Sequence, residues 1–223
     1  MIVYHGSDHI VEHPVYLGGK HSNDYGYGFY TTESADLAKE WACARATDGY
    51  ANRYELETEG LSILNLNGPE YSILNWLAVL TRYRTYWQKT SVSEEAKNYL
   101  QENFFVDPEP YDIIIGYRAD DSYFTFAQDF VAGTISLRKL SEAMKLGKLG
   151  EQIVLKSERS YSRIRFLDAE RADAAAWYDK KTDRDRDARR KYRAAKQSAD
   201  SRNEIFMLDI MREEMKNGDA RLR

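Results

Sequence analysis

Cysteine is almost absent from this sequence, and its scarcity excludes several kinds of structure. The 223 residues include one cysteine, Cys43, so no disulfide can form within the chain and no metal site can be built from clustered thiolates. No apolar run is long enough to span a bilayer, and the first residues show no leader pattern. We therefore expect a soluble protein of the reducing cytoplasm that makes no contact with a membrane.

A strong net charge is also lacking. The formal net charge of −4 excludes the overall basic surface that many nucleic-acid-binding proteins carry, but it leaves room for a local one. Tyrosine, in contrast, is abundant, with 17 tyrosines against 8 phenylalanines. Its ring combines an apolar face with a polar tip, which suits a binding cleft as well as a half-buried strand.

The hydrophobic pattern predicts an α+β domain over residues 1–168. Strands are expected at both ends of this segment with helices inserted between them, which argues against a regular βαβ repeat. The expected strands are 1–7, 53–66, 112–117, 151–157 and 163–167, and the expected helices are 34–42, 69–87, 93–103, 123–131 and 136–146. Thr31, Thr32 or Ser34 can cap the first of these helices.

Residues 169–223 differ in character and are predicted to form a helical C-terminal extension. They are rich in Ala, Arg, Lys and Asp and contain no proline. Residues 171–196 hold ten Lys or Arg against five Asp, a local excess of +5. Two interpretations stay open: a solvated helix with many ion pairs, or an arm that binds a partner or a nucleic acid. An apolar stripe near the end would pack on the body or on a partner: Ile205, Phe206, Leu208, Met211 and Met215.

Three histidines near the N-terminus, His5, His9 and His13, are spaced four residues apart. On a helix this spacing would align three imidazoles for zinc. A helix is not expected here, because Val3 and Tyr4 favour a strand and Pro14 follows closely. We therefore predict no metal site and expect His5 to have a role of its own.

Other catalytic patterns are also missing. No serine lies in a nucleophile elbow, and Cys43 falls within a helical pattern without an obvious base. Gly26 and Gly28 precede a helix, but a third glycine and the preceding strand of a dinucleotide fold are absent. Covalent hydrolases and classical dinucleotide-binding folds are therefore poorly supported.

Several motifs together carry a more specific signal. They occur in the order YHGS, GFYTT, a helix ending in WA, the loop GYRADD and the late strand GEQIVLKS. Together these motifs resemble the ADP-ribosyltransferase superfamily, in the branch of diphtheria toxin and the poly(ADP-ribose) polymerases. Within it they look closest to a family of bacterial domains of unknown function. The resemblance covers residues 1–168 and implies a split β-sheet with inserted helices, with NAD as co-substrate and no metal.

The resemblance also implies roles around the nicotinamide ring. Tyr30 would stack on nicotinamide, whose planar cationic ring suits an aromatic face. Trp41, three helical turns later, would close the other face; equally, it could belong to the apolar core, because it lies on the apolar side of its helix. Gly28 would shape the turn before Tyr30.

The first strand would hold the rest of the co-substrate. By resemblance, His5 bonds the adenine-side ribose and the backbone of Gly6 grips the nicotinamide amide, with Ser7 in support. A glycine suits this position because backbone groups can approach a ligand closely there. The alternative is that His5 has a purely structural role, as a histidine at a strand end that is hydrogen-bonded to a neighbouring loop.

The third motif of the superfamily is ambiguous in this chain. Glu151 matches the usual glutamate by its pattern, whereas the closer family resemblance indicates Gln152. Successive side chains of a strand point to opposite faces, so only one of the two can enter the cleft. Alternation slightly favours Gln152, which would bind ribose hydroxyls but supply no full negative charge to the developing ribosyl cation.

Further carboxylates follow the buried strand at 112–117. Asp120 and Asp121 could supply the missing charge or a base for the acceptor, although a turn or helix cap is the commoner use of such residues. Asp24 is expected to order the loop that carries the stacking ring.

Taken together, the sequence predicts a mono-ADP-ribosyltransferase that cleaves NAD, releases nicotinamide and modifies a protein or nucleic-acid acceptor. By analogy with the family, it would be a bacterial toxin of a toxin–antitoxin or phage-defence system, with an antitoxin or inhibitor as candidate partner of the C-terminal helices. Two alternatives stay open: an NAD glycohydrolase, and a degenerate module that binds NAD or a partner without turnover.

Overall fold

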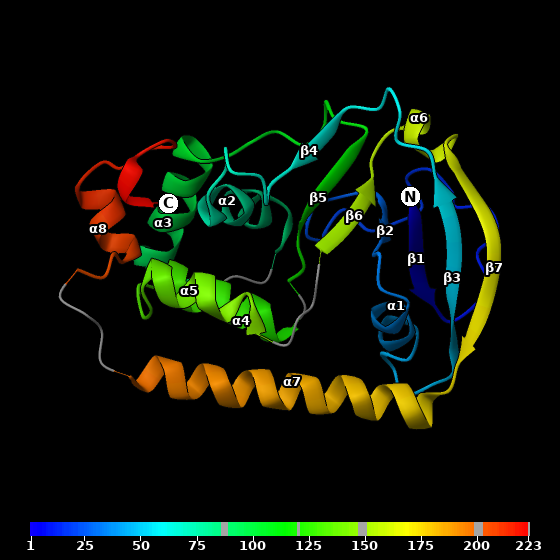
Figure 1. Ribbon diagram of the computed structural model, residues 1–223. Helices are drawn as coiled ribbons and strands as arrows, with labels where there is room; N and C mark the ends of the chain where they lie inside the picture. The colour runs from blue at the N-terminus through cyan, green and yellow to red at the C-terminus, as the bar shows by residue number, and fades with distance from the viewer. Residues whose placement is uncertain (86–88, 120, 147–150, 199–202, 223) are drawn as a thin grey trace.

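Two β-sheets organise the chain, which has a mixed α+β architecture (Figure 1). A computed structural model describes residues 1–85, 89–119, 121–146, 151–198 and 203–222, with the side chains of 121 and 122 excluded. The first sheet is antiparallel, in the order β1 (Ile2–Ser7), β3 (Gly49–Leu56) and β7 (Ile164–Ala172). The second has the order β2 (Phe29–Thr31), β6 (Glu151–Leu155), β5 (Ile113–Tyr117) and β4 (Ile63–Asn65).

Helices pack beside and beneath these sheets (Figure 1). They are α1 (Ala35–Ala42), α2 (Ile73–Tyr83), α3 (Ser91–Asn103), α4 (Asp121–Val131), α5 (Leu137–Ala143), α6 (Glu158–Tyr161), α7 (Ala174–Gln197) and α8 (Met207–Arg212), followed by the 3₁₀ turn η2 (Ala220–Leu222). Within the described residues, no helix combines the length and the apolar character needed to cross a bilayer.

The two sheets meet where the first strand passes the short strand β2. An isolated bridge joins Tyr4 to Thr32, with backbone hydrogen bonds of 2.8 and 3.0 Å in the two directions. Ser34 is the residue that caps α1, and its hydroxyl accepts a hydrogen bond from the Leu37 amide at 3.2 Å. No strand was expected at Tyr30; it occupies the middle of β2, which pairs with β6.

Strand β6 lies at the centre of the fold and is buried on both faces. Val154 belongs to the main core formed with the helices, whereas Ile153 and Leu155 belong to a smaller core between the two sheets. The strand expected over 53–66 is in fact two strands of different sheets, β3 and β4, because the polar residues between them turn the chain.

The C-terminal segment is integral to the fold. The expected boundary after Asp168 falls inside β7, whose pairing with β3 continues to Ala172. Helix α7 then runs beneath both sheets (Figure 1) and buries Ala188 and Tyr192 in the main core.

The tail packs on the body, one of the two expected outcomes, and most of the predicted stripe takes part. Met215 is buried in the main core and Ile205 and Met211 pack against it, whereas Leu208 is 50% exposed. Met207 and Ile210 of α8, which were not part of the predicted stripe, are also buried in the main core.

Candidate functional site

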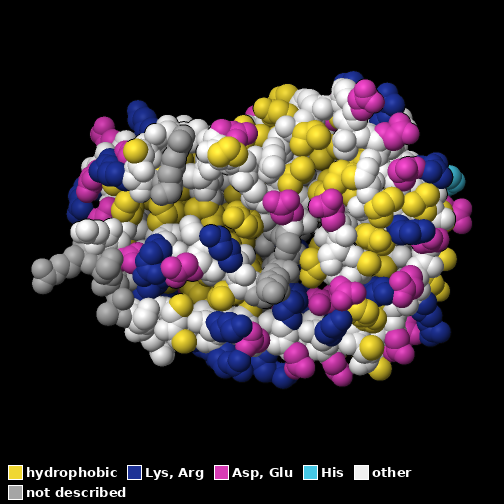
Figure 2. Space-filling model, viewed as in Figure 1, with side chains coloured by type: hydrophobic (Ala, Val, Ile, Leu, Met, Phe, Trp, Pro, Cys, Tyr) yellow, Lys and Arg dark blue, Asp and Glu magenta, His cyan; other side chains and the backbone are white. Residues whose placement is uncertain are grey.

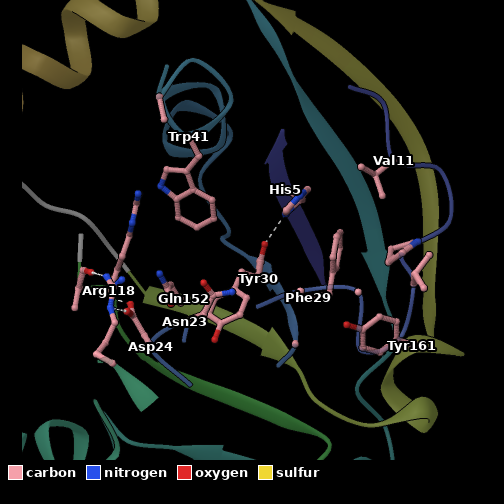
Figure 3. A pocket seen from close by; sticks show the side chains of 18 of the residues that line it. His5, Val11, Asn23, Asp24, Phe29, Tyr30, Trp41, Arg118, Gln152 and Tyr161 are labelled. Carbon is pink, nitrogen blue, oxygen red and sulfur yellow. Dashed lines mark hydrogen bonds and ion pairs between the residues drawn. The ribbon is translucent and has the colours of Figure 1, made fainter. Parts of the chain in front are cut away.

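A cleft of about 600 Å³ opens where the two sheets approach each other. Residues from β1, β2, β6, α1 and α7 line it, together with the loops before β2 and after β5. Figure 3 shows His5, Tyr30, Gln152 and Trp41 around this space. These four residues were all singled out from the sequence, and the fold brings them together from widely separated segments.

His5 and Tyr30 are joined directly across neighbouring strands. The Nδ1 atom of His5 lies 2.8 Å from the carbonyl oxygen of Tyr30 (Figure 3). Since a carbonyl can only accept, Nδ1 carries the proton, and Nε2 of the neutral ring is the acceptor. The imidazole also packs on Phe29, with ring centroids 4.5 Å apart, and burial lowers its pKa below the ordinary value. His5 is therefore held as a neutral ring of defined tautomer.

The hydroxyl of Tyr30 ties its ring to the preceding turn. It donates to the carbonyl of Gly26 at 2.8 Å and accepts from the amide of Tyr25 at 3.0 Å. Burial raises the pKa of this phenol well above its ordinary value, so the hydroxyl stays protonated. The ring is consequently fixed in place, which suits a stacking surface.

Lys156 stabilises the same turn by hydrogen bonds to its backbone carbonyl groups. Its ammonium donates to the carbonyls of Tyr25 and Tyr27, both at 2.8 Å, and to the carboxylate of Glu109 at 3.1 Å. Burial lowers the pKa of this amine. No pattern in the sequence singled out Lys156, which directly follows β6; its signal is that it continues the alternation of Gln152 and Val154.

Two glycines shape the turn for different reasons. Gly26 adopts a positive φ of 75°, and a Cβ there would come within 2.6 Å of the Tyr83 ring. A Cβ on Gly28, which lines the cleft, would come within 2.5 Å of Val154. Of the neighbouring tyrosines, Tyr25 is fully buried, with its hydroxyl donating to the Tyr117 carbonyl at 2.6 Å, and Tyr27 is exposed.

The ambiguity between Glu151 and Gln152 has a clear geometric answer. Gln152 is 6% exposed and lines the cleft, and its Oε1 atom is buried without a hydrogen-bond partner among the described residues. Glu151 points the other way, into solvent, where its carboxylate accepts from the Asn67 amide at 2.7 Å. An amide, not a carboxylate, therefore faces the cleft from β6.

Trp41 faces the cleft from α1. Its indole lies at the edge of the main core and lines the cleft at the same time. Packing against the core is thus confirmed, whereas a contact with a ligand ring stays a prediction. The Nε1 atom is buried and finds no hydrogen-bond partner in the described part of the chain. The guanidinium of Arg118 lies 4.5 Å from the centre of the ring, a cation–π distance.

Asp24 holds two cleft segments together. Its buried carboxylate forms an ion pair with Arg84 at 2.8 Å and accepts from the Ala119 amide at 2.9 Å. Arg84 in turn donates to the Ala119 carbonyl. The turn that carries Tyr30 is thereby linked to the loop that carries Arg118, consistent with the ordering role expected for Asp24.

Gly6 and Ser7 do not line the cleft. A Cβ on Gly6 would come within 1.9 Å of the Ala38 carbonyl, so the missing side chain is what allows β1 to pack against α1. The Ser7 hydroxyl donates to the His9 carbonyl at 2.7 Å and accepts from Asn52 at 2.9 Å. The glycine therefore has a packing reason that sequence reasoning did not anticipate.

The paired aspartates after β5 are only partly placed. Asp120 and the side chain of Asp121 lie outside the described residues. The backbone of Asp121 begins α4.

Helix α7 supplies residues to the cleft that the sequence did not indicate. Lys181 and Asp185, one helical turn apart, line the cleft and contact each other at 3.7 Å. Their helix is anchored to α1 by an ion pair between Arg184 and Glu40 at 2.6 Å. The sequence signal was the local charge, which gave no information about which side of α7 faces the cleft.

A metal centre has no support from the geometry. Across residues 1–85, 89–119, 121–146, 151–198 and 203–222, no three His, Cys, Asp or Glu side chains are grouped so as to hold an ion. His9 instead contacts Asp8 at 2.6 Å in an exposed loop.

Comparison with known proteins places most of the chain in one family. Neither the curated proteins nor the solved structures contain a significant match. The family model described as protein of unknown function (DUF3990) matches residues 1–166, which include every cleft residue except those of α7. The chain thus belongs to the DUF3990 family, over the segment that builds both sheets and the cleft between them.

Proposed function

We propose that this protein is an NAD-dependent mono-ADP-ribosyltransferase that releases nicotinamide and transfers ADP-ribose to a macromolecular acceptor. One observation carries the proposal: His5, Tyr30 and Gln152 come from three strands and converge on one cleft, with Trp41 on the adjoining helix. The motifs that resemble the superfamily supply a His, a Tyr and, in place of its usual glutamate, a Gln in the same order.

The polar atoms of the cleft support a ligand of this kind. Buried polar groups are normally hydrogen-bonded, so the unpaired Gln152 Oε1 and Trp41 Nε1 are suited to groups of a bound molecule. In this assignment Tyr30 and Trp41 hold the nicotinamide ring, and Nε2 of His5 accepts from a ribose hydroxyl. NAD supplies a cationic leaving group, and breaking its glycosidic bond develops positive charge on the ribose.

Gln152 is assigned the role of orienting that ribose. Its amide oxygen accepts from a hydroxyl and presents a partial negative charge to the developing cation. The fixed His5 tautomer and the anchored Tyr30 ring reduce the reorganisation needed when the bond breaks.

Matched variants of neighbouring residues test this assignment. We expect Gln152→Ala to lower the rate of nicotinamide release about a hundredfold, the scale seen when one stabilising hydrogen bond is lost from an active site. Glu151→Ala, one residue away and facing solvent, should leave the rate unchanged. Release is measured chromatographically after incubation with NAD. A larger loss of nicotinamide release in Glu151→Ala than in Gln152→Ala would contradict this assignment of the site.

A second candidate, a module that binds NAD without efficient turnover, is favoured by the charge of the cleft. The carboxylates that line its described part are Asp24 and Asp185, and both contact cationic side chains. For this candidate, calorimetry would detect NAD binding while no nicotinamide appears, and Gln152→Glu would introduce release. An NAD glycohydrolase would instead yield free ADP-ribose without labelling protein or nucleic acid.

The biological setting we propose is the bacterial cytoplasm, as a toxin of a toxin–antitoxin or phage-defence system. It rests on the resemblance and on the site. Growth arrest on expression of the wild type, and normal growth with Gln152→Ala at equal protein levels, is the expected result. An antitoxin or inhibitor protein that contacts the C-terminal helices would be recovered bound to the inactive variant.

A further inference from the structure

The C-terminal half of α7 carries charge of one sign. Residues 186–196 hold six cations and one acid, although the whole chain has a net charge of −4. All six cations are exposed: Arg186, Arg189, Arg190, Lys191, Arg193 and Lys196. The acid, Asp187, already pairs with Arg190 and Lys191. A segment of eleven residues is therefore strongly basic on an otherwise acidic protein.

Five of these cations form a continuous stripe along one side of the helix. Arg186, Arg189, Arg190, Arg193 and Lys196 recur at intervals of three or four residues, the spacing of one helical face. The stripe is about 15 Å long at the helical rise of 1.5 Å per residue. Figure 2 shows Lys and Arg side chains gathered along the lower edge of the molecule, where α7 runs in Figure 1. The adjacent face of the helix is used for packing, through Ala188 and Tyr192.

The stripe is fixed in position relative to the cleft. Lys181 lines the cleft, and Arg186 begins the stripe about 7.5 Å further along the same helix. Glu40 anchors the helix near the cleft, and Asp129 of α4 anchors its far end through Tyr192 at 2.6 Å and Lys196 at 2.7 Å. The stripe therefore begins within two helical turns of the cleft, on the neighbouring side of the same helix.

We propose that α7 binds the phosphate backbone of a nucleic acid and that this nucleic acid is the acceptor; the second part rests on the proposed function. Regularly spaced arginines on one face match a regularly charged polyanion. A membrane is disfavoured because none of the exposed large apolar side chains of the described residues lies in α7. At the stripe itself a protein partner is disfavoured, because these residues offer no apolar centre of the kind that protein interfaces bury.

Binding is tested with the full chain, fluorescently labelled single-stranded RNA, and DNA of the same sequence. The stripe variant is Arg186→Gln, Arg190→Gln and Arg193→Gln together. The matched control is Arg53→Gln, Arg163→Gln and Arg165→Gln, which removes the same charge from exposed ion pairs of the first sheet. We expect the stripe variant to reduce the slope of log K against log salt by roughly 2, the loss of three phosphate contacts. The control should keep the wild-type slope.

The outcomes separate this proposal from the proposed function. Three results would overturn the assignment of the stripe as a nucleic-acid site. They are no binding of either nucleic acid, an equal loss of nucleic-acid binding in both variants, and binding to phosphatidylserine vesicles alone. Label from biotinylated NAD on nucleic acid, lost in the stripe variant, would support the acceptor assignment, and label on protein alone would overturn it. Nicotinamide release without acceptor should be equal in both variants; its absence from the wild type would refute the proposed function and leave the binding result intact.

Discussion

Two tryptophans of the main fold have contrasting surroundings. Trp76 is fully buried, and its Nε1 donates to the Tyr117 carbonyl at 3.0 Å. Trp41 is partly exposed to the cleft, and its Nε1 is one of the buried polar atoms without a partner in the described residues. The same residue type thus serves stability in one place and presents an unused donor in the other.

Replacing each tryptophan by phenylalanine should separate these roles. Trp76→Phe breaks a buried hydrogen bond and leaves a cavity, so we expect the free energy of unfolding to fall by about 2–4 kcal/mol. Trp41→Phe should cost about 1 kcal/mol or less, because no hydrogen bond is lost. Urea denaturation measures both values. Affinity for NAD should fall only in Trp41→Phe, and equal unfolding costs would contradict the distinction.

His5 makes the stability of the protein depend on pH. Burial lowers its pKa below 6.5, while its hydrogen bond to Tyr30 opposes the shift. As pH falls below 6.5, the imidazole of His5 becomes protonated in the unfolded chain while it stays neutral in the folded chain. The free energy of unfolding should therefore fall with acidification, by at most about 1.4 kcal/mol per pH unit, and should receive no such contribution at higher pH.

The comparison of His5→Gln with His13→Gln tests this dependence. Thermal unfolding between pH 5 and pH 7.5 should show a weaker acid loss in His5→Gln, measured as the change of Tm with pH. The exposed His13 provides a control that removes a histidine without changing the core. If His13→Gln flattened the profile and His5→Gln did not, the assignment to His5 would be wrong.

At the scale of elements, α7 is the feature that the sequence described least well. Its helical state and basic charge were expected, but its contact with the cleft was not. The ion pair that holds it is well shielded: the side chains of Glu40 and Arg184 are 6% and 13% exposed. Removing only one member of such a pair lowers the free energy of unfolding strongly, because the charge of the other member stays buried without a partner.

A double-mutant cycle measures this anchor. Glu40→Gln and Arg184→Met should each destabilise the protein by about 3 kcal/mol, and the double variant should lose less than the sum. The exposed pair Arg190 and Asp187 is the control, for which coupling below about 1 kcal/mol is expected. Additive losses at Glu40 and Arg184 would show that α7 is held by other contacts.

Other elements illustrate why local pattern worked in some places and failed in others. Strands β1, β5 and β6 and helices α1, α3 and α4 lie close to their expected positions because their apolar periodicity is strong. Strand β2 was not expected, since its three residues exist as a strand only through pairing with β6, far away in sequence. The packed face of α8 was predicted only in part, because the surface against which a short helix packs decides which of its apolar residues are buried.

At the scale of the whole molecule, the core joins segments from both ends of the chain. Met207, Ile210 and Leu222 are buried in the same cluster as Tyr25 and Leu37. The family match ends at residue 166, but the packed structure includes α7 and α8. The segment beyond the family match therefore completes both the core and one wall of the cleft.

The sequence by itself determined the α+β class and the basic character of α7, which follow from local periodicity and residue composition. The motif resemblance pointed to His5 and Tyr30, and it left open the place of Trp41 and the choice between Glu151 and Gln152. Tertiary structure alone decided that Gln152 points into the cleft and Glu151 points away from it. Apolar residues of β6 are buried on both faces, so the alternation of apolar and polar residues does not tell which face borders the cleft. Tertiary structure also decided that Gly6 serves packing and that α7 forms a wall of the cleft, since both depend on contacts between segments distant in sequence.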